Sequence, residues 1–269
     1  KADEDWNNFS PAVTLAWDLS DDVNVYARYA EGWKSGGFNG EAGSPESFQR
    51  AYDPEEVASY ELGLKSRWLD DRLQLNAAAF QNKVDDMQLS IFLADGSAAS
   101  VVDNAGKATV QGVELELVAV PVENLQLNFN YGYLDAEYDE YIDAGVDVAN
   151  DRDVAYAPEN TASAGIQYTV PGVLCGNLTA RLDWTYTDDR VVYTEPLQNL
   201  HSQLDAYSLL NGRLTLADIP LGNGSMKVAA WGKNLLDEDY RMSTIPFIIW
   251  TVSYYGAPRT YGMDLSYEF

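Results

Sequence analysis

Four things are scarce in this sequence, and each scarcity excludes a class of protein. There is one cysteine, Cys175, so no disulfide can form within the chain. There is one histidine, His201, and neither a second histidine nor a cysteine cluster accompanies it to build a zinc site. The sequence also marks no pairing of a serine with this histidine. We therefore expect a protein that is not an enzyme and that carries no metal and no cofactor.

Basic residues and long apolar runs are also few. Lys and Arg total 17 against 42 Asp and Glu, which gives a formal net charge of -25. Surfaces that bind nucleic acid or an anionic membrane leaflet need clustered basic groups, so this balance argues against both partners. No apolar stretch reaches the roughly 20 residues of a membrane-spanning helix. The best candidate, residues 245–255, is shorter and contains Pro246, so a membrane assignment must depend on strands.

Apolar and polar residues alternate along most of the chain with a period of two, which is typical of strands that have one apolar face. In one such run, apolar residues at 125, 127, 129, 131 and 133 alternate with Gln126, Asn128 and Asn130. This pattern predicts about eleven strands, near residues 10–19, 23–34, 57–68, 72–91, 105–119, 125–138, 160–170, 178–192, 206–216, 226–234 and 258–269.

The connections between these predicted strands alternate in length. The shorter ones lie at 20–22, 69–71, 120–124, 171–177 and 217–225, and the longer ones at 35–56, 92–104, 139–159, 193–205 and 235–257. All short turns therefore fall on one side of the sheet, as in outer-membrane barrels. The 18 Tyr and 7 Trp suit interfacial girdles at strand ends. We predict an all-β fold, an antiparallel up-and-down transmembrane β-barrel; a soluble sandwich or an eleven-stranded can is the alternative.

The odd number of predicted strands limits how such a sheet can close. The first and last of eleven strands run in the same direction, whereas bacterial single-chain barrels have even strand numbers. Eleven is half of the 22 strands of plugged outer-membrane transporters. No linker or composition shift divides the chain. We therefore expect residues 1–269 to form one domain, the C-terminal part of a 22-stranded barrel whose other strands lie upstream.

Eight short segments are informative as an ordered set. They are residues 25–39 (VYARYAEGWKSGGFN), 54–55 (PE), 59–65 (SYELGLK), 103–108 (DNAGKA), 112–116 (GVELE), 233–237 (KNLLD), 239–240 (DY) and the closing 258–269. In this order and spacing they resemble TonB-dependent outer-membrane receptors, especially the siderophore-receptor group. The resemblance runs from about residue 10 to the end of the chain.

This resemblance implies a barrel in the outer membrane of a Gram-negative bacterium, filled by an N-terminal plug. Such receptors import a scarce ligand with energy delivered by the TonB complex through the plug, and a ferric siderophore is the expected ligand. Haem, cobalamin and oligosaccharide receptors share this half of the barrel, so they remain open. The sequence contains no plug domain, and we expect that this chain alone transports nothing. A passive porin or structural outer-membrane barrel is the alternative function, and a soluble binding module is a third.

Aromatic and cationic residues in two long loops are the candidate ligand contacts, because they suit stacking on planar iron chelates and bonding to anionic groups. The candidates are Trp33, Lys34, Phe38, Phe48 and Arg50 in the first loop and Arg241, Phe247, Trp250, Tyr254 and Tyr255 in the last. The alternatives are a packed or mobile external loop for the first set and an interfacial girdle for the second. Gly36 and Gly37, within the first loop, allow backbone conformations that other residues resist.

Charged residues on the polar side of the alternation are expected to face the lumen, because burying them against lipid is unfavourable. These are Glu61, Lys65, Arg67, Glu114, Glu116, Arg181 and Asp183. The apolar side is expected to contact lipid and lipopolysaccharide, and Tyr267 and Phe269 to signal to the barrel-assembly machinery. The acidic run 135–153 is expected to be a solvated loop. The alternative for this run is a calcium site that bridges to lipopolysaccharide phosphate.

Overall fold

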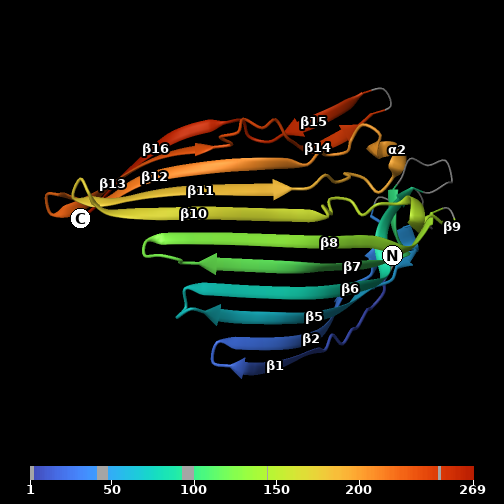
Figure 1. Cartoon of the computed structure of the whole chain (residues 1–269). Helices are drawn as coiled ribbons and strands as arrows, with labels where there is room; N and C mark the ends of the chain where they lie inside the picture. Colours follow the sequence, from blue (N-terminus) through green and yellow to red (C-terminus); the bar gives the residue numbers. More distant parts are fainter. Residues whose placement is uncertain (1–2, 41–47, 93–99, 144, 248–249) are drawn as a thin grey trace.

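The computed structural model describes residues 3–40, 48–92, 100–143, 145–247 and 250–269. Its main element is a sheet in which eleven long strands are antiparallel neighbours in chain order (Figure 1). These strands are β1 (Ala12–Ser20), β2 (Val23–Lys34), β5 (Glu55–Trp68), β6 (Leu73–Phe92), β7 (Ser100–Ala119), β8 (Leu125–Asp143), β10 (Asn160–Val173), β11 (Gly176–Thr187), β12 (Tyr207–Leu221), β13 (Gly224–Lys233) and β16 (Thr260–Glu268). Among the described residues, no helix is long and apolar enough to cross a membrane.

The prediction of about eleven antiparallel strands is confirmed, and the corrections concern the strand ends. On the side of the long loops, β7 begins at Ser100 and β8 continues to Asp143, where loops at 92–104 and 139–159 were predicted. The two strands pair there, with Gly106 opposite Tyr141, because backbone hydrogen bonding continues beyond the residues that alternate regularly. In contrast, β11 ends at Thr187 rather than at 192. On the other side, two turns shrink to residues 174–175 and 222–223.

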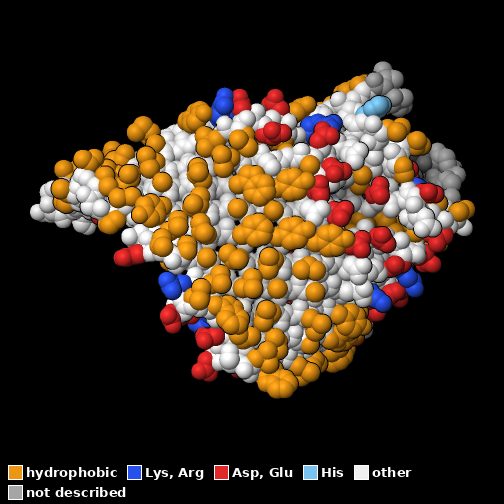
Figure 2. Space-filling model, viewed as in Figure 1, with side chains coloured by type: hydrophobic (Ala, Val, Ile, Leu, Met, Phe, Trp, Pro, Cys, Tyr) orange, Lys and Arg blue, Asp and Glu red, His pale blue; other side chains and the backbone are white. Residues whose placement is uncertain are grey.

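The register places the apolar residues of neighbouring strands on one face, because residues opposite one another point the same way. Leu62 of β5 lies opposite Ala79 of β6, Ala79 lies opposite Val113 of β7, and Val113 lies opposite Tyr133 of β8. Figure 2 shows an apolar field across the middle of the sheet, with acidic side chains gathered toward the loop side. One face of the sheet is therefore apolar over a limited height.

The height of this apolar band matches that of a membrane-spanning band. On β8 the apolar residues run from Leu125 to Tyr133, and the same face then carries Asp135. At about 3.4 Å per residue, that run is about 27 Å along the strand, or about 21 Å at a tilt of about 40°. Outer-membrane barrels have bands about 25 Å tall. The sheet thus has the dimensions of a barrel wall.

Aromatic residues mark both margins of the band. At the loop side, the rings of Tyr29 and Tyr60 lie 5.1 Å apart. At the turn side, Trp17 and Trp68 are exposed on the ends of β1 and β5. Tyr and Trp prefer the boundary between hydrocarbon and water, because one part of each ring system is apolar and another is polar. The positions of these rings therefore agree with the band's membrane-spanning height.

The main buried cluster lies on the loop side, beyond the apolar band. It consists of Leu89, Ala105, Ala108, Tyr138, Tyr141 and Ala149. The rings of Tyr138 and Tyr141 meet edge to face at 5.1 Å. These residues come from the loop-side extensions of β6, β7 and β8 and from the connection after β8. The loop side is therefore a folded layer with its own core.

Candidate functional site

The long connections fold into short elements that build this loop-side layer. They are β3 (Gly37–Phe38), β4 (Ala51–Tyr52), β9 (Val146–Asp147), the 3-10 turn η1 (Ala149–Asp151), α2 (Pro196–Asn199), β14 (Arg241–Pro246) and β15 (Thr251–Tyr255). Strand β3 pairs with β4, and β14 pairs with β15. The alternation of the sequence predicted none of these elements, because each is too short to show a period. Both sets of candidate ligand contacts lie in or beside them.

The first set of candidates is only partly brought together. Trp33 and Lys34 are consecutive on β2 and pair with Glu56 and Glu55, so their side chains point to opposite faces. Phe38 instead packs beside Trp6, with ring centroids 6.1 Å apart. The positions of these three side chains do not form one pocket wall, and Phe38 has an aromatic neighbour that the sequence did not indicate.

The remaining two candidates of this set differ in their partners. Phe48 is 42% exposed. Arg50 forms an ion pair with Asp103 at 3.0 Å, although its side chain is mostly exposed. A guanidinium that is paired in this way offers less charge to a ligand than the sequence suggested. Whether either residue contacts ligand stays a prediction.

The Gly-Gly pair is explained by close packing rather than by unusual backbone angles. Neither Gly36 nor Gly37 has a positive φ. A Cβ on Gly36 would overlap the Tyr52 carbonyl oxygen and the Trp6 ring, and a Cβ on Gly37 would overlap the Tyr52 hydroxyl. The expected need for conformational freedom is therefore replaced by a need for space. Two aromatic rings press against the backbone at this point.

Only two members of the second set line a cavity in the loop-side layer. That cavity, about 550 Å³, is lined by Asp205, Ala206, Tyr207, Glu238, Asp239, Tyr240, Arg241 and Tyr255. Arg241 and Tyr255 were predicted contacts, and the guanidinium of Arg241 pairs with Asp205 at 2.8 Å. Phe247 and Trp250 stack on each other at 4.2 Å, outside this cavity. Tyr254 is exposed on β15, opposite Ser243 of β14.

The sequence did not indicate the stacked aromatic pair that lines this cavity. Tyr207 and Tyr240 stack with ring centroids 4.6 Å apart, and the Arg190 guanidinium lies 5.6 Å from the Tyr207 ring. These residues come from three separate segments, so no local pattern joined them. Stacked rings and hydrogen-bonding groups around a cavity suit the binding of a planar ligand.

Three long connections are tied together within the loop-side layer. The Tyr193 hydroxyl donates to the Thr244 carbonyl at 2.8 Å, and the Thr244 hydroxyl donates to the Ser202 carbonyl at 2.9 Å. Arg152 pairs with Glu195 at 2.7 Å and with Asp143 at 3.2 Å. Burial raises the pKa of the Tyr193 hydroxyl above its usual value. The loop-side layer is thus cross-connected rather than a set of independent loops.

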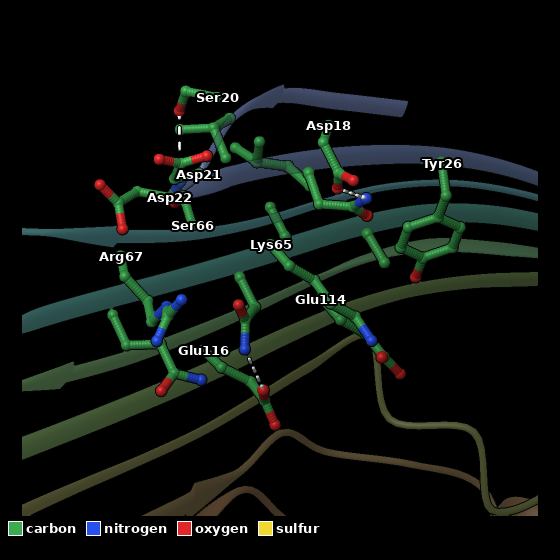
Figure 3. Close-up of a pocket in the computed structure, with 17 residues that line it drawn as sticks. Asp18, Ser20, Asp21, Asp22, Tyr26, Lys65, Ser66, Arg67, Glu114 and Glu116 are labelled. Atoms are coloured by element: carbon green, nitrogen blue, oxygen red, sulfur yellow. Dashed lines mark hydrogen bonds between the residues drawn. The ribbon is translucent and has the colours of Figure 1, made fainter. Parts of the chain in front are cut away.

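The seven residues predicted to face the lumen all lie on the face opposite the apolar band. Lys65, Arg67, Glu114 and Glu116 line a hollow of about 510 Å³, and Figure 3 shows them on the strands β5 and β7, which lie on either side of β6. On the same face, Glu61 accepts a hydrogen bond from Tyr26 at 2.6 Å, and Arg181 pairs with Asp183 at 2.7 Å. The structure brings these charges onto one surface. That the surface lines a lumen stays a prediction.

The acidic run is more structured than a solvated loop, since β8 continues through its first part and β9 and η1 follow. Hydrogen bonds from the backbone N–H groups of Ala149 and Tyr141 hold the pKa of Asp147 below its usual value. Asp139 accepts a hydrogen bond from Thr109 at 2.7 Å. Within the described part of the chain, no three acidic, histidine or cysteine side chains gather closely enough to hold a metal ion.

The predicted assembly signal lies at the turn-side end of β16. The rings of Tyr267 and Phe269 are 6.1 Å apart, and the Phe269 side chain is fully exposed. The Tyr267 hydroxyl donates to the Leu221 carbonyl at 3.1 Å. Phe269 is therefore accessible to another protein, and its role as a signal stays a prediction.

Comparison with known proteins gives consistent results. The family model described as "TonB dependent receptor-like, beta-barrel" matches residues 1–235. The metal-pseudopaline receptor of Pseudomonas aeruginosa is 32% identical over 143 residues, which is 52% of this chain and 19% of that protein. The ferric-pyoverdine receptor of Pseudomonas sp. strain M114 is 27% identical over 268 residues, 97% of this chain and 29% of that protein.

A solved structure shows the same fold. The ferric yersiniabactin uptake receptor from Yersinia pestis superposes with a TM-score of 0.77 at 23% identity, covering 96% of this chain and 37% of that receptor. At this level of identity the similarity establishes the fold alone. In every one of these comparisons the chain spans well under half the length of the relative.

Proposed function

Because the chain belongs to the TonB-dependent receptor-like β-barrel family, we propose that it forms part of the barrel of an active importer for a ferric siderophore or a similar metal–chelator complex. Members of the family are receptors of the Gram-negative outer membrane and are not enzymes. The relatives in the comparison are named for metal-pseudopaline, pyoverdine and yersiniabactin. These names support the ligand class and leave the individual ligand open.

The observation that carries this proposal is the two-faced sheet with a folded layer at its loop side. The apolar face, represented by the row from Leu62 to Tyr133, contacts lipid in the intact protein. The opposite face, with Lys65 and Glu116, lines the lumen and contacts a plug domain. The loop-side layer faces the outside, where the cavity beside Tyr207 and Tyr240 receives the ligand.

Closing this sheet into a barrel requires additional strands. The edge strands β1 and β16 run in the same direction, because the chain reverses direction ten times along the eleven antiparallel strands, so these two edges cannot pair antiparallel with each other. The relatives are roughly 2.5 to 3.5 times as long as this chain, because 96% of the chain covers 37% of one receptor and 97% of it covers 29% of another. We assign the remaining strands, the plug and the TonB contact to the rest of a longer receptor.

The proposal is tested by uptake in cells that carry the complete receptor. A host without its own siderophore receptors is supplied with radioactive iron bound to yersiniabactin or to pyoverdine, with and without a functional TonB. Saturable uptake that requires TonB supports an active importer. Unsaturable uptake that persists without TonB supports the alternative, a passive porin. No uptake of either complex would remove the siderophore assignment for these two ligands.

A further inference from the structure

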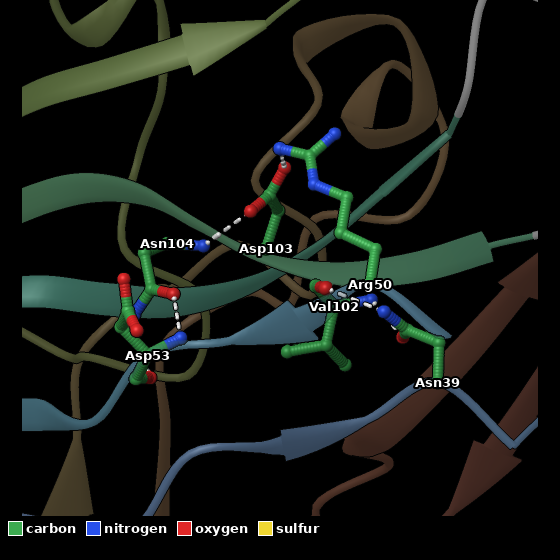
Figure 4. A network of polar contacts seen from close by, with 6 residues as sticks. All are labelled: Asn39, Arg50, Asp53, Val102, Asp103 and Asn104. Atoms are coloured by element: carbon green, nitrogen blue, oxygen red, sulfur yellow. Dashed lines mark hydrogen bonds and ion pairs between the residues drawn. The ribbon is translucent and has the colours of Figure 1, made fainter. Parts of the chain in front are cut away.

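The ladder formed by β3 and β4 is too small to be stable by itself. It consists of two residue pairs, Gly37 with Tyr52 and Phe38 with Ala51. Even a complete two-stranded hairpin is only marginally stable in water. The ladder must therefore be held by its surroundings. Contacts with the loop-side part of β7 hold it, and Figure 4 shows Val102, Asp103 and Asn104 of β7 with Asn39, Arg50 and Asp53 beside the ladder.

Asn104 of β7 makes the largest number of these attachments. Its side-chain carbonyl accepts the backbone N–H of Asp53 at 2.6 Å. Its NH₂ group donates to the backbone carbonyls of Asp53 at 2.9 Å and of Asp86 at 2.7 Å. Asp86 has a φ of 52° and lies at a register shift in β6. One amide side chain thus uses both donors and its acceptor to join three segments.

Asn39 makes a second attachment at the other end of the ladder. Its side chain accepts the backbone N–H of Val102 at 2.7 Å and donates to the Val102 carbonyl at 2.9 Å. The amide therefore occupies the place that a neighbouring strand would take beside β7. An aspartate could not reproduce this arrangement or that of Asn104, because a carboxylate has no N–H to donate.

The ion pair nearby contributes less than the two amides. Arg50 and Asp103 approach to 3.0 Å, but the Arg50 side chain is 72% exposed. Exposed ion pairs add little to stability, because water screens them and two long side chains must be ordered. Gln88 of β6 also donates to the carbonyls of Ser35 and Asp53, at 3.0 and 3.1 Å. Asn39 and Asn104 are the residues that attach the ladder to β7, so the loss of either should loosen it.

We propose that Asn39 and Asn104 are positioning residues for ligand capture: they hold the β3–β4 ladder against β7 before ligand arrives. The ladder carries Phe38, whose ring lies beside the Trp6 ring. The backbone at Gly36, directly before the ladder, packs against the same Trp6 ring. A surface that is already ordered binds more tightly, because no ordering has to accompany binding. The amides themselves contact no ligand. The effect on ligand binding rests on the proposed function. The attachment of the ladder to β7 rests on the structure alone.

The first experiment needs no ligand. Hydrogen–deuterium exchange is measured on the complete receptor in lipid, for wild type, Asn39→Ala and Asn104→Ala. Peptides that cover Gly37, Phe38, Ala51 and Tyr52 should exchange about tenfold faster in each variant. Asn130→Ala is the matched control, because it removes an asparagine hydrogen bond, to Ser163 at 3.0 Å, in the strand wall. Unchanged exchange of the ladder in both variants would overturn the proposal.

The second experiment measures ligand capture with iron bound to yersiniabactin and to pyoverdine. Asn104→Ala should raise the KM for uptake about tenfold and leave the maximal rate unchanged. Asn104→Asp should behave like Asn104→Ala, and Asn130→Ala like wild type. A fall in the maximal rate of Asn104→Ala with no change in its KM would overturn the positioning role, because it would indicate loss of folded receptor.

A cross-link provides the rescue. Arg50→Cys and Asp103→Cys, in a Cys175→Ser background, are joined by a short thiol-reactive linker in two receptors, one with Asn104 intact and one with Asn104→Ala. Equal KM values in the two linked receptors support the inference that position alone was lost, and a higher KM in the linked Asn104→Ala receptor contradicts it. If wild type takes up neither complex, the proposed function fails for these ligands. The exchange experiment still decides whether the amides hold the ladder.

Discussion

Replacing Leu182 with arginine measures which face of the sheet meets lipid. Leu182 lies in the middle of the apolar residues of β11, between Ala180 and Trp184 on the same face. Arginine at the midplane of an outer-membrane barrel destabilises it by about 2–4 kcal/mol. We expect about 3 kcal/mol here, which corresponds to a fall of more than 100-fold in the folding equilibrium constant. The loss arises because the guanidinium is removed from water without a partner.

Thr185→Arg is the matched control for this change. Thr185 is three residues along the same strand and lies opposite Ser163, on the face that carries Arg181. Its arginine should stay hydrated and lower the stability by less than about 1 kcal/mol. The assay is urea unfolding of the complete receptor in phospholipid vesicles, followed by tryptophan fluorescence. Equal losses in both variants, or a larger loss for Thr185→Arg, would refute the assignment of the faces.

Three further changes examine the loop-side layer. Tyr141→Ala should leave a cavity in the buried cluster and destabilise the layer by about 3 kcal/mol; proteolysis should then cut near residues 143–159 while the strands stay intact, and equal resistance to protease would contradict this. Gly36→Ala should displace Tyr52 and lower ligand affinity, as measured by the KM for uptake, with Gly40→Ala as the control because a Cβ there meets nothing within 4 Å. Asp147 has a lowered pKa in the folded layer, so its stabilising effect is present above its unfolded pKa of about 3.9 and is lost as pH falls through the lower folded value. Asp147→Asn should therefore remove this acid dependence of the layer's resistance to protease. An unchanged acid profile in the variant would contradict this.

The main sheet could be predicted from the sequence because its cause is local. A strand in a membrane wall must alternate apolar and polar residues, and eleven such runs are visible without knowledge of any contact. Strand ends were predicted less well for the same reason. The alternation of β8 changes phase after Tyr133, because Leu134, Ala136 and Tyr138 are apolar instead of the odd-numbered residues, while backbone pairing with β7 continues to Tyr141.

The candidate site was only partly predictable because its causes are not local. Residue type identified Arg241 as a binding candidate, but its partner Asp205 lies 36 positions away in the sequence. The stack of Tyr207 on Tyr240 likewise depends on how two loops meet. The Gly-Gly pair was noticed but explained wrongly, because the space that Trp6 and Tyr52 occupy is visible only in three dimensions.

Local alternation in the sheet and non-local contacts in the loop-side layer restrict the choice of amino acid to different degrees. In the row that we propose to contact lipid, Leu62, Ala79 and Val113 differ in size, because contact with lipid requires only that each side chain be apolar. At position 104 the side chain must donate two hydrogen bonds and accept one at fixed distances, and asparagine has the donors, the acceptor and the length that this requires. The wall can therefore change its residues while keeping its fold, whereas the layer that holds the proposed ligand site depends on single side chains. Differences in ligand between receptors with this wall must then arise in the loop-side layer and on the lumen face.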